Sequence, residues 1–127
     1  MAKSYFCLMI LLLLPSYISS WIISPNECNP GCIRIIQWPS GYAGLHIPKY
    51  TVQITNEAWH SKGVYNVEIA CPAFASTTLI NPAIFRRIDL VHCVLKNGRI
   101  FNTGEVITFE YSNILPYPLA IVSMKCL

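Results

Sequence analysis

The sequence has few charged residues and none of the short motifs that mark common catalytic or metal sites. Only 12% of its 127 residues are charged, and the formal net charge is +3. It lacks a nucleophile elbow, a phosphate-binding glycine loop, a C-x-x-C pair and any histidine spacing that would suit a metal. Nucleic acid binding needs several clustered phosphate contacts, which these sparse basic residues do not supply. We therefore expect no enzymatic activity, no metal, no cofactor and no nucleic acid partner.

Residues 1–20 have the features of a secretory signal peptide. Lys3 gives a short basic start, residues 5–14 are uniformly apolar, and Ser19 and Ser20 offer small residues to a signal peptidase. This apolar run is about half of the roughly 20 residues that a membrane span requires. We expect cleavage between about Ser20 and Ser24, export from the cell, and no membrane insertion of the cleaved protein.

Five cysteines would remain after cleavage, and their number is odd. They are Cys28, Cys32, Cys71, Cys93 and Cys126. In an oxidising compartment such residues ordinarily form disulfides. If two disulfides form, one cysteine is left over. It is then free, or it bonds to a second chain, or Cys28 and Cys32 compete for the same partner.

Short extended segments separated by turn-forming residues make up most of the remaining chain. Several of them alternate apolar and polar residues, which is the period of a half-buried strand. In the last segment this alternation places Ala120, Val122, Met124 and Cys126 on one face. The expected strands are residues 33–38, 50–56, 64–71, 93–96, 99–101, 106–111 and 119–126.

Two turn signals complete the expected fold. Asn97-Gly98 favours the positive φ angles of a tight hairpin, so residues 93–96 are expected to pair with residues 99–101. Asn81-Pro82 suits the start of a helix, which predicts one helical turn there. For residues 21–127 the sequence thus predicts a single all-β domain: a small, disulfide-linked antiparallel β-sandwich or barrel of about seven strands with one short helical turn.

Carboxylates and tryptophans offer few candidates for function. Glu68 and Glu110 would have to meet across neighbouring strands to act as acid and base on a glycan, and a solvated position for each is favoured. Trp38 and Trp59 lie in or beside loops, where exposed tryptophans often contribute to binding. Packing at the rim of a small core accounts for them equally well.

The order and spacing of many residues also resemble a known family. The residues concerned are Cys28, Gln37, 48–56, Cys71, Phe74, Ser76, Asn81, Pro82, 85–87, Asp89, Cys93, Asn97, Gly98, Gly104, 107–113, 117–119, Ser123 and Cys126. Together they resemble the tapetum determinant family of secreted, cysteine-rich plant proteins. Two departures stand out: Ala58 and Lys62 replace a pair of family cysteines, and Cys32 occupies a position where the family has none.

The resemblance implies an extracellular, apoplastic ligand that binds a leucine-rich-repeat receptor kinase and directs cell fate in the anther or a related tissue. It also implies a fold held by disulfides among Cys28, Cys71, Cys93 and Cys126, with three possible pairings. Cys32 is then expected to be unpaired or to link two chains in a disulfide-bonded dimer.

Arg86, Arg87 and Lys96 are the predicted receptor contacts, because they flank expected turns that lie close together in the chain. Arg86-Arg87 is the only dibasic step, and it is interpreted as solvated loop charge, as a contact patch or as a processing site. The alternative function is an extracellular cell-wall glycan-binding β-sandwich that uses Trp38 or Trp59.

Overall fold

The computed structural model describes residues 28–127; the expected signal peptide and its cleavage site lie outside the described residues. Within residues 28–127 the chain forms eight strands and two short 3-10 turns, and every strand pair is antiparallel. The all-β prediction is confirmed. The elements are η1 (Pro30–Cys32), β1 (Ile33–Tyr42), β2 (Pro48–Asn56), β3 (Gly63–Ala70), β4 (Phe85–Arg87), β5 (His92–Leu95), η2 (Lys96–Gly98), β6 (Phe101–Asn102), β7 (Val106–Ser112) and β8 (Ala120–Cys126).

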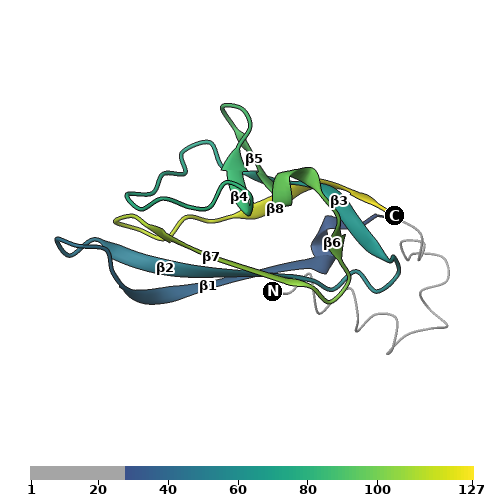
Figure 1. Ribbon diagram of the computed structural model, residues 1–127, viewed down its shortest axis with the longest axis horizontal. Coiled ribbons are helices and arrows are strands. Elements are labelled where there is room, and N and C mark those ends of the chain that lie inside the picture. The colour runs from purple at the N-terminus through teal and green to yellow at the C-terminus, as the bar shows by residue number, and fades with distance from the viewer. Residues whose placement is uncertain (1–27) are drawn as a thin grey trace.

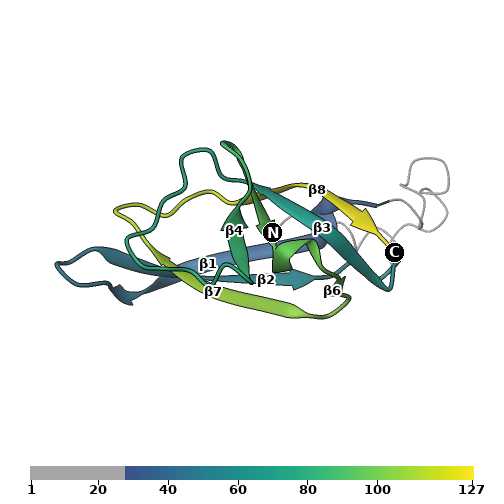
Figure 2. The same cartoon turned by 45° about the horizontal axis from the view of Figure 1, so that its top comes forward.

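The strands form two separate sheets that pack face to face, so the fold is a sandwich (Figure 1). One sheet has the order β1-β2-β7. In the other, Glu68 of β3 pairs with Val94 of β5 and also with Ser123 of β8, which places these two strands on opposite edges of β3. β6 shares the β5 edge, and β4 lies outside β5. Figure 2 shows β3 crossing obliquely over the strands of the first sheet.

Apolar side chains from both sheets fill one core. Val52 and Ile54 on β2, and Phe109 and Tyr111 on β7, are buried as the alternation of these strands predicts. Phe109 stacks on Phe85 of β4, with ring centroids 4.7 Å apart, so this pair joins the two sheets. Large-to-small changes at such positions remove apolar contacts and leave a cavity.

Two polar side chains link distant segments inside this core. Asn56, at the end of β2, is completely buried; its amide donates to the carbonyl of Phe101 and its Oδ1 accepts from the amide of Ala58. The Tyr111 hydroxyl donates to Gln37 and accepts from the backbone N–H of Tyr117. Burial raises the pKa of Tyr111, which keeps the hydroxyl neutral and able to donate.

Two disulfides each involve a strand of the second sheet. Cys28 bonds to Cys126 at the end of β8, and Cys71, which follows β3, bonds to Cys93 on β5. This is one of the three pairings left open by the sequence. None of the cysteines in residues 28–127 is a free thiol, which corrects the expectation that Cys32 is unpaired. Cys32 is 1% exposed and lies in the core, and its expected disulfide to a second chain stays a prediction.

Two local expectations are wrong and one is confirmed. β5 pairs with β3 and β4, and its residues make no hairpin with residues 99–101. The single helical turn expected after Asn81 is present: the N–H groups of Ile84 and Phe85 donate to the carbonyl of Asn81, and the Asn81 side chain accepts from the N–H of Ala83. In β8 the register shifts opposite β3, so Ile121, and not Val122, packs against the core.

Candidate functional site

The predicted contact residues lie on one part of the second sheet, which we call the β4–β5 corner and define as residues 85–99. It contains β4, the connecting turn, β5 and η2. In β4, Phe85 is buried while Arg86 and Arg87 are exposed. The turn carries three exposed apolar side chains, of which Leu90 at 87% is the most accessible. The corner therefore presents apolar and basic groups together.

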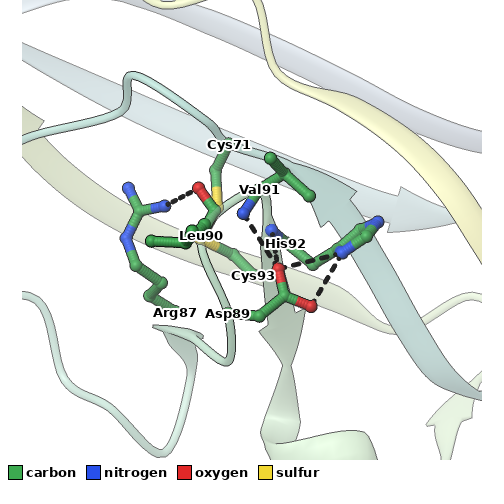
Figure 3. Close-up of polar contacts among 7 residues, drawn as sticks. All are labelled: Cys71, Arg87, Asp89, Leu90, Val91, His92 and Cys93. Atoms are coloured by element: carbon green, nitrogen blue, oxygen red, sulfur yellow. Dashed lines mark hydrogen bonds and ion pairs between the residues drawn. A yellow bond between two sulfur atoms is a disulfide. The ribbon is translucent and has the colours of Figure 1, made fainter.

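Asp89 fixes the conformation of the turn (Figure 3). Its Oδ1 accepts from the backbone N–H groups of Val91 and His92 at 2.9 and 2.8 Å, and Oδ2 lies 2.9 Å from Nδ1 of His92. The N–H of Val91, followed by the contact with His92, holds the pKa of Asp89 below its ordinary value of 3.8. These bonds add to the backbone hydrogen bonds that the N–H groups of Ile88 and Asp89 donate to the carbonyl of His92.

Arg87 is a structural brace within the corner. Its Nη1 donates to the carbonyl of Leu90 at 3.1 Å and its Nη2 to the carbonyl of Phe74 at 2.8 Å. Figure 3 shows the guanidinium beside Leu90, close to the Cys71–Cys93 disulfide. Since both Nη groups are engaged, Arg87 holds the turn against the segment that follows β3.

Lys96 also has a structural role. Its Nζ lies 2.7 Å from Oε2 of Glu105 and 2.8 Å from the carbonyl of Ile100. Partial burial acts to raise the pKa of Glu105, but hydrogen bonds from Lys96 and from the N–H of Asn102 outweigh it, and that pKa lies below its ordinary value of 4.5. The charge of Lys96 is thus neutralised within the chain.

Arg86 and Arg99 differ from these two residues. Arg86 donates through Nε to Oδ1 of Asn97 at 2.6 Å, and Arg99 donates through Nε to the carbonyl of Lys96 at 3.1 Å. In the described part of the chain neither guanidinium makes an ion pair, and neither uses its Nη groups. Sequence reasoning missed Arg99, because only the folded turn shows that Arg86 and Arg99 are anchored on the adjacent residues Asn97 and Lys96.

η2 supports both arginines through an unusual backbone. Lys96, Asn97 and Gly98 have φ angles of 53°, 55° and 79°. A Cβ on Gly98 would lie 2.7 Å from Oδ1 of Asn66, so glycine is required there for both space and conformation. The Asn97-Gly98 signal thus predicted positive φ correctly, although the strands around it pair differently.

A second surface is a shallow groove between edge strand β1 and residues 116–118. It encloses about 360 Å³, and Trp38 is 41% exposed beside it. The other predicted tryptophan, Trp59, follows the far end of β2 and does not line this groove. The lining residues are Gln37, Trp38, Pro39, Tyr50, Pro116, Tyr117 and Pro118.

A third surface, the loop end, consists of residues 39–47, 72–84 and 113–118. Figures 1 and 2 place these connections at the same end of the sandwich, and the side chain of Asn113 joins two of them by donating to the carbonyl of Ala75. None of the three segments contains Asp, Glu, Lys or Arg. The exposed large apolar residues of the loop end are Tyr42, Leu45, Leu79, Ile114 and Leu115.

The structure separates the two carboxylates weighed as an acid and base pair. Glu68 is on β3 and Glu110 is on β7, in different sheets, and each alternates with residues that face the core. They therefore lie on opposite outer faces. In residues 28–127 no group of three or more His, Cys, Asp or Glu side chains is arranged to hold a metal ion. That same part of the chain has no helix of the length and apolarity needed to cross a membrane.

Comparisons with known proteins agree with the resemblance. The family model described as "Tapetum determinant 1, C-terminal" matches residues 29–127. The chain is 30% identical over 101 residues to TPD1 protein homolog 1 of Arabidopsis thaliana, covering 80% of this chain and 56% of that protein. It is 34% identical over 104 residues to TPD1 protein homolog 1B of Oryza sativa subsp. japonica, covering 82% and 61%.

A further rice relative, TPD1 protein homolog 1A, is 33% identical over 99 residues, which cover 73% of this chain and 42% of that protein. The chain thus spans less than two thirds of the length of each of these relatives. No solved structure matches it. Because the family model extends over nearly all of the described residues, the chain belongs to the tapetum determinant family.

Proposed function

We propose that this protein is a secreted plant signalling ligand that binds the ectodomain of a leucine-rich-repeat receptor kinase and directs cell fate in the anther or a related tissue. Family membership supports this proposal. The structural observation that carries it is the β4–β5 corner, where Leu90 projects from a braced turn next to exposed arginines. Arginine is enriched in binding hot spots, and the exposed leucine beside it adds apolar area that a partner can bury.

The corner is also suited to binding because it is rigid. The hydrogen bonds of Asp89, the brace from Arg87 and the Cys71–Cys93 disulfide hold its backbone before any partner arrives. A surface that is already ordered loses less conformational entropy when it binds a partner. A leucine-rich-repeat ectodomain offers an extended concave face that can receive such a projecting turn.

Secretion to the apoplast belongs to the same proposal. Cys28–Cys126 and Cys71–Cys93 are the kind of bonds that persist in oxidising compartments. We further propose that the protein acts by binding rather than by catalysis, as a monomer with no disulfide to a second chain.

The test is to express the full chain in insect cells, recover it from the medium and measure its binding to a panel of plant leucine-rich-repeat receptor ectodomains. We expect an oxidised monomer by non-reducing mass spectrometry and saturable binding to one receptor or a small related group. Retention of the chain inside the cells would contradict secretion. A folded, secreted monomer that binds no member of the panel would contradict the receptor proposal.

Two matched variants locate the interface. Leu90→Ser removes the apolar group at the corner, and Leu79→Ser makes the same change at the loop end, where the side chain is at least as accessible. We expect Leu90→Ser to weaken binding by about 10-fold or more and Leu79→Ser to leave it unchanged. The reverse result would move the interface to the loop end.

The groove beside Trp38 supports a second candidate, a cell-wall glycan-binding module, because aromatic faces in a shallow groove suit stacking against sugar rings. Pull-down with insoluble cell-wall polysaccharides tests it, with Trp38→Ala as the variant and Trp59→Ala as the control. Binding that is lost only in Trp38→Ala would favour this function. Absence of binding by the unmodified protein would remove it.

A further inference from the structure

The basic residues of the described chain are unevenly neutralised. Four ion pairs engage four carboxylates: Arg34–Glu57, Lys49–Glu110, His92–Asp89 and Lys96–Glu105. Of the bases in residues 28–127 that make no ion pair, three are the arginines of the β4–β5 corner. The corner is therefore the part of the described surface where uncompensated positive charge gathers.

Hydrogen bonding then divides those arginines into two kinds. Both Nη groups of Arg87 donate to backbone carbonyls, those of Leu90 and Phe74. Arg87 therefore cannot offer its two Nη groups together to a ligand. Arg86 and Arg99 are held only through Nε, on the adjacent residues Asn97 and Lys96. Each of these two guanidiniums is oriented by η2 and keeps both Nη groups available.

This arrangement matches the chemistry of carboxylate recognition. A guanidinium presents two parallel N–H donors that fit the two oxygens of a carboxylate, and such bidentate pairs are stronger than neutral hydrogen bonds. Anchoring Nε lowers the entropy that the side chain loses when it forms them. Glu68 makes no ion pair within residues 28–127. Glu68 on β3 and Arg86 on β4 both pair with Val94 of β5, so at ordinary strand spacing their backbones are about 10 Å apart.

We propose that Arg86 and Arg99 form a carboxylate-binding pair that engages aspartate or glutamate side chains on the partner protein, while Arg87 and Lys96 hold the corner without contacting the partner. This inference rests on the proposed receptor-binding function. It adds the chemical class of the receptor's contact residues, replaces two of the three sequence-predicted contacts, and introduces Arg99.

Titration with a glutamate-rich hexapeptide tests the pair without requiring a receptor. The 15N-labelled full chain, secreted and oxidised, is followed through the Nε–H signals of its arginines by NMR. We expect saturable shifts at Arg86 and Arg99 and none at Arg87. Shifts spread equally over all arginines, or confined to Arg87, would overturn the proposal. If inorganic phosphate or sulfate shifts the pair and the peptide does not, the carboxylate assignment is wrong.

Binding to a receptor identified in the panel provides the second test. Arg86→Ala and Arg99→Ala are each expected to weaken binding by at least about 10-fold and to reduce its dependence on salt. The double variant Arg34→Ala/Lys49→Ala, which changes net charge as much as Arg86→Ala/Arg99→Ala, is the control because both residues are on the other sheet. Equal weakening in the two double variants would overturn the proposal, leaving only a net-charge effect.

Arg87→Ala separates bracing from contact. We expect a lower Tm, with affinity for the receptor restored at temperatures where the variant is fully folded. Loss of affinity in a folded Arg87→Ala variant, together with full affinity in Arg86→Ala and Arg99→Ala, would overturn the proposal. If no receptor binds the unmodified chain while the peptide shifts Arg86 and Arg99, the receptor function fails and the carboxylate pair stands.

Discussion

The two sheets of this sandwich are stabilised in different ways. In the β1-β2-β7 sheet, β1 and β2 pair over nearly their whole length and β7 continues the register without interruption. In the other sheet, β4, β5 and β6 pair over two or three residues each, and the register of β3 against β8 shifts. The Cys71–Cys93 disulfide joins β5 to the end of β3 within this second sheet, and Cys28–Cys126 attaches the end of β8 to the segment that precedes η1 and β1. A covalent bond thus supplements hydrogen bonding at the short strand β5.

This contrast also separates structure from proposed function. Long, regular strands leave little freedom to position an exposed group, whereas the short strands around β5 end in turns that project Leu90 and anchor Arg86 and Arg99. Turns of this kind are mobile unless they are held. Here Asp89, Arg87 and the Cys71–Cys93 disulfide hold them, which lets an irregular region serve as a defined surface.

The largest effect is expected where the two sheets meet. Phe109→Ala removes the ring that stacks on Phe85 across the core and should lower the free energy of unfolding by about 3–5 kcal/mol. Val106→Ala, on the outer face of the same strand and 47% exposed, is the control and should change it by less than about 0.5 kcal/mol. Urea denaturation measures both. Similar losses in the two variants would mean that the β7 faces are assigned the wrong way round.

Removing the Cys71–Cys93 bond should distinguish the two sheets most directly. In Cys71→Ala/Cys93→Ala we expect a loss of about 2–5 kcal/mol, because the unfolded chain gains freedom. We also expect hydrogen exchange to accelerate in β4 and β5 well before β2, since the short strands lose their covalent support. Equal acceleration in β2 and β5 would show that the sheets open together and that the comparison drawn above does not hold.

Sequence reasoning succeeded in the regular sheet and failed in the irregular one for a physical reason. The alternation of residues 50–56 and 106–111 reports burial on one face, and a long strand follows that pattern. The pairing of β5 depends instead on neighbours distant in the chain, so the Asn97-Gly98 signal gave the correct φ angles and the wrong partner. In β8, one residue more than in the facing part of β3 lies between Ser123 and Ile121. This register shift places Ile121 on the core side, where simple alternation predicts Val122.

The candidate site follows the same division. The sequence pointed to the corner through Arg86, Arg87 and Lys96 as predicted contacts, but it could not assign their structural roles. Arg87 braces the turn because the fold brings the carbonyl of Phe74 within hydrogen-bond distance of it. Lys96 is neutralised because the fold brings the carboxylate of Glu105 next to its Nζ. These contacts depend on tertiary structure and have no local signal.

A smaller effect is expected from the polar link between the sheets. Asn56→Ala leaves the carbonyl of Phe101 and the amide of Ala58 buried without a partner, which should cost about 1–3 kcal/mol. Asn113→Ala, which removes two side-chain hydrogen bonds near the surface, should cost less because water can replace them. Thermal unfolding of both variants makes the comparison. An equal cost would argue that Asn56 is accessible to water and does not link the sheets.

The smallest effect is expected from pH at the edge of the corner. Because the pKa of Glu105 is lowered in the folded protein, the unfolded chain binds more protons at mildly acidic pH, and the stabilisation is present above pH 4.5 and lost as pH falls through the folded pKa. The Lys96–Glu105 pair is partly exposed, so its contribution should be less than about 1 kcal/mol.

Glu105→Gln should therefore be less stable than the unmodified protein at pH 7 and approach it below pH 4.5, as measured by Tm across that range. Asp89, whose pKa is also lowered, is present in both proteins, so their difference isolates Glu105. Glu68→Gln controls for the loss of one negative charge on the same sheet. A difference between Glu105→Gln and the unmodified protein that stays constant from pH 7 to pH 3 would mean that the pair does not stabilise the corner, and η2 would then depend on its backbone hydrogen bonds alone.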